Sequence, residues 1–275
     1  MSSNTLDTGT PDLLATLDEG VMTLCFNRPE ARNALSRSMN DALQVQLLEA
    51  ERNPEVKCVL LTGNGKAFCA GGDVKGMLTR TFNLPGSPTI DEYIHRQRMD
   101  QRATSGRLFS MPKPTIAAIP GAAAGAGMSL ALACDLRLMA NTAFMTTAFA
   151  RVGFSGDYGG TYFLTRLVGA AKARELYLLS ERIDAELALQ LGLTNWVCPA
   201  EDLNQRALDL ARRLARGPSV AYRYMKENLN RAVHGELMDC MDLEATHHVH
   251  CGQTEDHREA SRAFVDKREP VFKGR

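Results

Sequence analysis

Residues 120–135, PGAAAGAGMSLALACD, constrain the fold more than any other stretch of the chain. They follow residues 115–119, a short apolar run typical of a buried strand, and they lead into an apolar helix. Glycine and alanine make up most of the turn between the two, and glycine allows a close approach to the main chain. The unpaired N–H groups of a helix start favour an oxygen that becomes negative. The stretch therefore predicts either an oxyanion-binding turn or a tight turn where helix and strand pack closely.

The remaining pattern alternates between strands and helices. Two short alternating runs predict a hairpin, and Ser36 is a good N-cap for an amphipathic helix. A second glycine-rich loop, residues 63–73, follows a buried strand, and residues 76–90 lack apolar periodicity and are predicted to form a mobile loop. The predicted strands are residues 13–17, 21–26, 56–62, 115–119, 136–139 and 196–198. The predicted helices are residues 36–52, 90–109 and 170–179, with further helices beginning near residues 161 and 185.

From residue 202 onward the pattern is almost entirely helical. Strand and helix alternation before that point indicates an α/β core, and a helical tail is typical of a cap or an oligomerisation arm. The sequence therefore predicts an α/β core over residues 1–201 and a helical C-terminal region over residues 202–275.

Charge and composition exclude several classes of partner. The 32 lysines and arginines equal the 32 aspartates and glutamates, so no net field attracts nucleic acid or a membrane surface. No apolar run approaches the ~20 residues of a membrane-spanning helix, and the N-terminus lacks the pattern of a secretion signal. The seven cysteines are odd in number and several sit in apolar runs. We therefore expect a cytoplasmic protein with reduced thiols.

Several motifs together resemble the crotonase family, the enoyl-CoA hydratase/isomerase superfamily. They occur in family order along nearly the whole chain. They are NRPEARNAL at 27–35, FCAGGD at 68–73, KPTIAAIPG at 113–121, GAG at 125–127, CD at 134–135, GGT at 159–161 and KREPVF at 267–272. The resemblance implies a spiral of ββα units with a helical C-terminal region, assembled as a homotrimer or a dimer of trimers. It implies an acyl-CoA thioester as substrate and no separate cofactor, because coenzyme A is part of the substrate.

Carried over by position, the resemblance implies an oxyanion hole made by the backbone N–H groups of Gly72 and Ala126. Backbone donors aimed at a developing enolate are worth a few kcal/mol each in other enzymes. The family more often has glycine at the second position, so Ala126 is a mild departure. The implied contacts to coenzyme A and the acyl group are Arg28, Ala31, Ala70, Asp73, Val74, Ser129, Phe149, Phe272 and Lys273. For Arg28 and Lys273, a solvated surface charge is the alternative.

The chain departs from the hydratase pattern at both catalytic positions. Ser129 and Phe149 stand where hydratases of the family carry two glutamates, and neither side chain can act as a carboxylate acid or base. Asp157 instead falls where double-bond isomerases of the family carry their single carboxylate, and the chain resembles the branch of enoyl-CoA and epoxyphenylacetyl-CoA isomerases in which this carboxylate is an aspartate. One carboxylate suffices to move a proton between two carbons of an enolised thioester. The resemblance therefore favours an enoyl-CoA isomerase with Asp157 as its acid/base.

Other interpretations of these residues stay open at this stage. Asp157 is also a plausible N-cap for the following helix. The chain is alternatively an enoyl-CoA hydratase with a modified mechanism, or a binder of acyl-CoA without activity. A dehalogenase of the 4-chlorobenzoyl-CoA type is disfavoured, because Phe149 and Arg102 replace that pattern's tryptophan and histidine.

Two further groups of residues are candidates for binding. Met77, Tyr93 and Phe109 are expected to shape the acyl pocket. The cluster His247, His248, His250 and Cys251 has helical spacing that suits a metal, but no fixed fourth ligand accompanies it. A polar helix face or a subunit contact is the preferred interpretation of the cluster, so no metal site is predicted.

Overall fold

Two sheets carry the fold in the computed structural model, which describes residues 4–78 and 86–275. The larger sheet has seven strands in the spatial order β1 (Asn4–Leu6), β2 (Leu13–Asp18), β3 (Val21–Phe26), β4 (Cys58–Gly63), β6 (Thr115–Ile119), β8 (Leu136–Ala140) and β11 (Trp196–Cys198). The smaller sheet has four, in the order β10 (Ile183–Asp184), β9 (Phe144–Thr146), β7 (Ala122–Ala124) and β5 (Ala67–Cys69).

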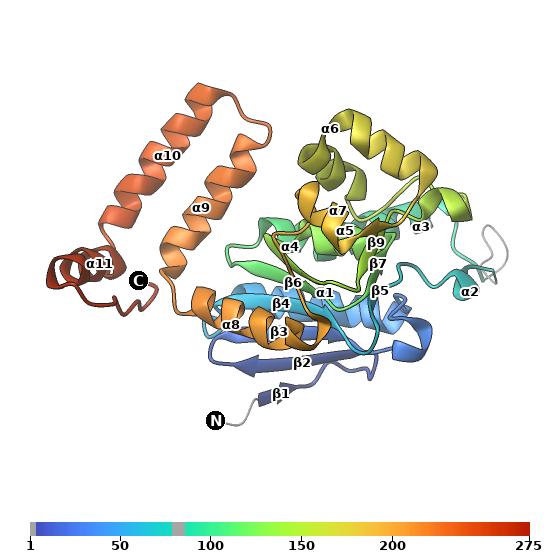
Figure 1. Cartoon of the computed structure of the whole chain (residues 1–275), viewed down its shortest axis with the longest axis horizontal. Coiled ribbons are helices and arrows are strands. Elements are labelled where there is room, and N and C mark those ends of the chain that lie inside the picture. Colours follow the sequence, from blue (N-terminus) through green and yellow to red (C-terminus); the bar gives the residue numbers. More distant parts are fainter. Residues whose placement is uncertain (1–3, 79–85) are drawn as a thin grey trace.

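The chain alternates between these sheets as it advances. β4, β6 and β8 lie side by side and parallel in the large sheet, and β5, β7 and β9 follow them in turn in the small sheet, again parallel. Helices follow each of these strand pairs along the chain (Figure 1). This repetition is the predicted spiral of ββα units, and the predicted hairpin is the antiparallel pair β2 and β3.

The helices match the sequence pattern closely. Ser36 caps α1, because its Oγ accepts a hydrogen bond from the Met39 N–H at 3.1 Å. Gly169, at φ +76°, interrupts α6 where the sequence predicted one helix to end and another to begin. The helices are α1 (Arg37–Arg52), α2 (Val74–Met77), α3 (Ile90–Gln101), α4 (Arg107–Ser110), α5 (Ala126–Ala133), α6 (Gly160–Leu179), α7 (Ala185–Gln190), α8 (Leu203–Ala215), α9 (Ser219–Ala232), α10 (Leu237–Gly252) and α11 (Glu255–Asp266). A π-helical turn, Arg102–Gly106, joins α3 to α4.

Two predicted loops contain short strands instead. The turn after residue 119 holds β7, and the loop 63–73 holds β5, so both glycine-rich stretches are partly extended. Three-residue strands are too short to show an alternating pattern, which is why the sequence did not reveal them. Of the predicted mobile loop 76–90, residues 76–77 end α2, and residues 79–85 lie outside the described part of the chain.

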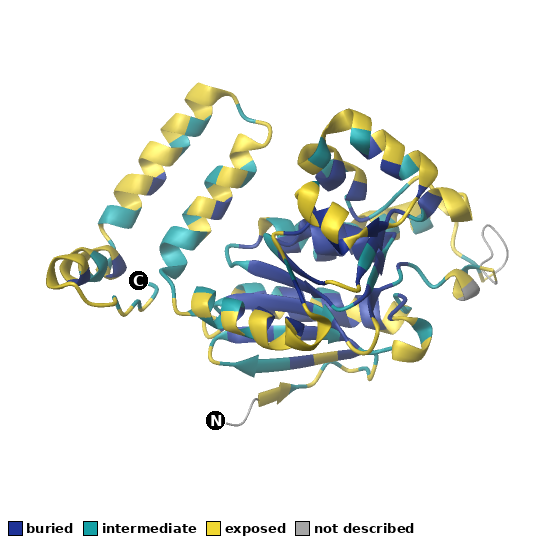
Figure 2. Cartoon of the chain, viewed as in Figure 1, coloured by how far each residue is buried: buried dark blue, intermediate teal, exposed yellow. Residues whose placement is uncertain are grey.

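Buried residues concentrate between the sheets and around α5, all of whose residues are buried (Figure 2). Cys58, Cys69, Cys134 and Cys198 are among them, as free thiols. Leu203 and Ala211 anchor α8 in the same core. The division into residues 1–201 and 202–275 stays a prediction. Helix α8, which belongs to the second part, packs against the α/β core.

The helices α9 to α11, which we call the C-terminal arm, extend away from the sheets (Figure 1). The Lys226 ammonium ties α9 to the core, because it donates to the carbonyls of Leu108 and Lys113 and to Asp135, at 2.9, 3.2 and 2.8 Å. The arm exposes many apolar side chains, including Met225, Leu229, Leu237, Met238, Met241, Val249, Phe264 and Val265. No helix among the described residues is long and apolar enough to cross a membrane.

Candidate active site

The two glycine-rich stretches meet at the start of α5. A Cβ added to Gly71 would lie 3.4 Å from the Ala126 nitrogen and 2.8 Å from the Ala124 carbonyl oxygen, so the two backbones are in close contact. Gly71 has a φ of +91°, so glycine is required there for its conformation as well as for its size. The fold therefore brings residues 70–73 and 124–127 together, as the motifs predicted.

The N–H groups of Gly72 and Ala126 lack main-chain partners among the described residues. Ala126 is the first residue of α5, where an N–H has no acceptor within the helix. The Leu35 N–H donates to the carbonyl of Gly71, the residue before Gly72, at 2.8 Å, and this bridge holds the loop in place. The bridge does not use the N–H of Gly72. Both residues line the same cavity, so two free backbone donors are available to one ligand.

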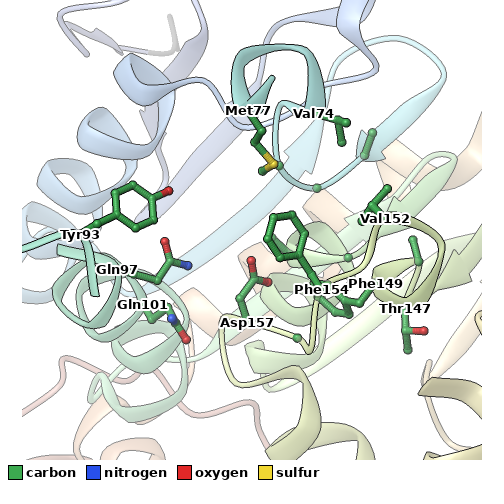
Figure 3. Close-up of a pocket in the computed structure, with 17 residues that line it drawn as sticks. Val74, Met77, Tyr93, Gln97, Gln101, Thr147, Phe149, Val152, Phe154 and Asp157 are labelled. Atoms are coloured by element: carbon green, nitrogen blue, oxygen red, sulfur yellow. The ribbon is translucent and has the colours of Figure 1, made fainter. Parts of the chain in front are cut away.

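The cavity has a volume of about 430 Å³ and two chemically different walls. Apolar side chains of Val74, Met77, Phe149, Val152 and Phe154 form one side, and α3 provides a polar side (Figure 3). The full lining is Ala70, Gly71, Gly72, Val74, Met77, Tyr93, Gln97, Gln101, Gly125, Ala126, Thr147, Ala148, Phe149, Val152, Phe154, Gly156 and Asp157. Asp157 is the only carboxylate among these residues.

Asp157 lies between the two walls with an unsatisfied oxygen (Figure 3). Its Oδ1 atom is buried and accepts no hydrogen bond from the described residues. Burial raises the pKa of Asp157 from an ordinary 3.8 to about 6, because the charged form is poorly solvated there. A carboxylate with a pKa raised in this way can both accept and return a proton close to neutral pH.

The backbone around Asp157 explains how the side chain is held. Tyr158 has a φ of +49°, which is uncommon for a residue with a side chain, and its hydroxyl donates to Asn40 Oδ1 at 3.2 Å. Gly156 and Gly159 on either side also have positive φ. The Asp157 side chain does not cap α6, which starts at Gly160 without any side-chain cap. The N-cap interpretation is therefore wrong.

A family model described as enoyl-CoA hydratase/isomerase matches residues 16–275. The chain belongs to the enoyl-CoA hydratase/isomerase family. Among curated relatives, 1,2-epoxyphenylacetyl-CoA isomerase of Escherichia coli (strain K12) is 37% identical over 96% of this chain and 98% of its own length. A Rhodobacter capsulatus protein named "Probable enoyl-CoA hydratase" is also 37% identical, over 94% of this chain and 96% of its own length.

Solved structures agree on the crotonase fold. The crystal structure of enoyl-CoA hydratase from Bacillus anthracis superimposes with a TM-score of 0.88 at 30% identity, covering 96% of this chain and 100% of that chain. The relatives carry both isomerase and hydratase names at the same identity. The chain is therefore an acyl-CoA enzyme of the enoyl-CoA hydratase/isomerase family.

Phe149 and Ser129, the two residues predicted to replace the hydratase glutamates, lie in different surroundings. Phe149 lines the cavity and stacks on Tyr177, with ring centroids 5.8 Å apart and planes at 11°. Ser129 is buried behind it, outside the lining, and its hydroxyl donates to the Gly125 carbonyl at 3.2 Å. The cavity thus has an aromatic ring at the position where the resemblance predicts that hydratases carry a carboxylate.

The predicted coenzyme A residues fall into two groups. Ala70 and Val74 line the cavity, and Arg28 lies close by, 3.4 Å from the Asp73 carboxylate and bonded to the Ala34 carbonyl at 2.8 Å. Ala31 follows Arg28 in a short 3₁₀ turn, Pro29–Ala31. Phe272 and Lys273 belong to the C-terminal tail, and the C-terminus lies beside α11 on the opposite side of the molecule from α2 (Figure 1). There the Lys273 N–H donates to Asp256 at 2.7 Å.

Some predictions about the acyl pocket need correction. Met77 and Tyr93 line the cavity, but Phe109 does not, because its ring packs against Phe163 and Tyr162. Sequence reasoning missed the α3 glutamines Gln97 and Gln101, and also Val152 and Phe154. The spacing of Tyr93, Gln97 and Gln101 by four residues was the available signal, since such residues share a helix face.

The histidine cluster forms ordinary helix contacts. The His247 ring stacks on Tyr224 at a centroid distance of 4.2 Å, and its Nδ1 lies 2.6 Å from Asn228 Oδ1. Among the described residues, no three histidine, cysteine or acidic side chains are grouped closely enough to hold a metal ion.

Proposed function

We propose that this protein is an enoyl-CoA isomerase that converts a 3-enoyl-CoA into its conjugated 2-enoyl isomer. The observation that carries the proposal is the single carboxylate of the cavity, Asp157, with a buried oxygen that has no partner in the described structure. A base that must remove a proton from carbon needs a free lone pair and a poorly solvated position, and Asp157 has both.

The proposed reaction begins with the thioester oxygen between the N–H groups of Gly72 and Ala126. Asp157 removes a proton from the carbon next to the thioester, and the electron pair moves onto the oxygen to give a dienolate. The two backbone donors stabilise that charge, and their fixed positions require no reorganisation. Asp157 then returns the proton to the γ-carbon, which restores the thioester carbonyl and leaves the double bond conjugated. One carboxylate serves both steps.

Phe149 supports isomerisation over hydration. Hydration requires a positioned water and a second acid or base, and the Phe149 ring stacked on Tyr177 offers neither. The apolar wall also keeps the dienolate away from water. An enoyl-CoA hydratase with a modified mechanism, and an acyl-CoA binder without activity, are the alternatives that the assay must separate.

For coenzyme A itself we propose contacts from Arg28, Ala31, Ala70, Asp73 and Val74, next to the cavity. Phe272 and Lys273 belong to the C-terminal tail, whose end lies on the opposite side of the molecule from α2 (Figure 1), so we propose that they reach the site of a neighbouring copy. The exposed apolar face of the C-terminal arm supports a homotrimer or a dimer of trimers. We further propose a cytoplasmic enzyme that needs no cofactor besides the coenzyme A of its substrate.

The test follows the absorbance of the conjugated thioester with wild type and Asp157→Asn. Wild type should generate conjugation from a 3-enoyl-CoA, and the isosteric variant should lose it while still binding a saturated acyl-CoA. Loss of conjugation from a 2-enoyl-CoA, with Asp157→Asn still active, would identify a hydratase. If tight binding of acyl-CoA occurs without turnover of either substrate, the protein is a binder.

A further inference from the structure

The polar wall of the cavity comes from one face of α3. Tyr93, Gln97 and Gln101 are spaced by four residues, so their side chains project from the same side of the helix. Figure 3 shows Gln97 and Gln101 directed toward the centre of the cavity, beside Asp157. An alkyl chain alone would need no amide at this place, and apolar residues line the opposite side.

The amides of Gln97 and Gln101 take part in no hydrogen bond among the described residues. Each amide offers two N–H donors and one acceptor oxygen. Water can satisfy them while the cavity is open, but an acyl group that fills it removes that water. A hydrocarbon chain would leave both amides unpaired, which is unfavourable, whereas an oxygen atom on the chain would pair with them.

A second cavity of about 280 Å³ extends this polar wall. It shares Gly72, Met77, Tyr93, Gln97, Ala126 and Asp157 with the first cavity. Beyond Gln97 it is lined by polar side chains, among them Asn40, Asp100 and Tyr158. Asp100 is held by Arg37 at 2.7 Å and Gln44 at 3.0 Å, so this chamber has a fixed polar surface. Polar surroundings of this kind disfavour a bare alkyl end.

We propose that the acyl group carries a hydroxyl substituent that Gln97 and Gln101 bind by hydrogen bonds. The inference rests on the proposed acyl-CoA function and names its substrate class. The apolar wall receives the hydrocarbon skeleton, and the α3 wall receives the oxygen. Gln97 and Gln101 thereby select the substrate, and Asp157 performs the proton transfer.

The test measures dissociation constants by calorimetry for saturated thioesters, which cannot isomerise. Hexanoyl-CoA is compared with hexanoyl-CoA derivatives that bear one hydroxyl at each carbon beyond the α-carbon in turn. The proteins are wild type, the double variant Gln97→Leu/Gln101→Leu, and His95→Leu as a control on an exposed, non-lining position of α3. Wild type and the control should bind at least one hydroxylated thioester about tenfold more tightly than hexanoyl-CoA. The double variant should lose this preference without losing affinity for hexanoyl-CoA.

Two results would overturn the inference alone. One is equal binding of hexanoyl-CoA and every hydroxylated derivative by wild type. The other is a double variant that weakens all thioesters equally, which would assign the glutamines to the coenzyme A arm. Absence of binding by every thioester would instead refute the proposed acyl-CoA function. Because no turnover is needed, failure of the isomerase assay leaves this measurement interpretable.

Discussion

The charge on Asp157 should reduce the stability of the fold, and the cost can be worked out from its pKa. Burial raises the pKa from 3.8 to about 6, so the folded protein holds this proton more tightly than the unfolded chain does. The stabilising contribution of the proton is complete below the unfolded pKa and is lost as the pH rises through about 6. At about 1.4 kcal/mol for each pH unit between the two pKa values, the ionised carboxylate costs about 3 kcal/mol near pH 8.

Asp157→Asn removes this charge while it preserves the shape of the side chain. We expect the variant to be more stable than wild type by about 3 kcal/mol at pH 8 and by about 0.5 kcal/mol at pH 4. The assay is equilibrium urea unfolding at several pH values and one fixed protein concentration, because association would shift the apparent stability. Asp202→Asn, at an exposed position outside the cavity, serves as the matched control and should show no such trend.

The result that would refute this reasoning concerns the pH dependence of the stability difference between Asp157→Asn and wild type, and not the absolute size of that difference. An amide at position 157 can add or remove a constant amount of stability by its own contacts. If the difference between variant and wild type is the same at pH 4 and pH 8, Asp157 is not a poorly solvated carboxylate. The argument for it as a base would then lose its physical support. If the stability difference grows with pH as expected, the folded protein holds a negative charge at Asp157 that lowers the stability of its own fold.

Four further predictions follow from the same structure. The kcat/KM of isomerisation should rise with pH up to about 6 and then level off, as Asp157 loses its proton, and a pH profile of wild type checks this. Ala126→Pro, which deletes the N–H at a helix position that accepts proline, should lower kcat about 100-fold or more, while Ala126→Gly retains activity in the same steady-state assay. Lys226→Met should cost about 3 kcal/mol in urea unfolding, because it removes the buried ammonium that pairs with Asp135 and donates to the carbonyls of Leu108 and Lys113, whereas the exposed Lys172→Met should cost less than about 1 kcal/mol. Phe264→Glu, which places a charge on the exposed arm, should reduce the mass measured by sedimentation if the arm joins copies, and an unchanged mass would locate the interface elsewhere.

Local signals determined much of the architecture. Ser36 capping α1, the break of α6 at Gly169 and the hairpin of β2 and β3 all depend on residues near in sequence, which is why they could be predicted. The pairing of short strands such as β5 and β7 depends on partners far along the chain, and the sequence pattern did not reveal it. The motif resemblance supplied the ββα spiral that local periodicity alone did not specify.

The features of the site divide in the same way into those that the sequence determined and those that the tertiary structure decided. The sequence by itself placed Asp157, Gly72 and Ala126 in loops that follow strands, and it excluded carboxylates at positions 129 and 149. Only the tertiary structure showed that the Oδ1 atom of Asp157 is buried without a hydrogen-bond partner in the described part of the chain, and that the side chain does not cap α6. It also moved Ser129 and Phe109 out of the cavity lining and brought Gln97 and Gln101 into it. Solvation and free hydrogen-bonding capacity depend on every neighbour in space, and a linear pattern records only the neighbours along the chain.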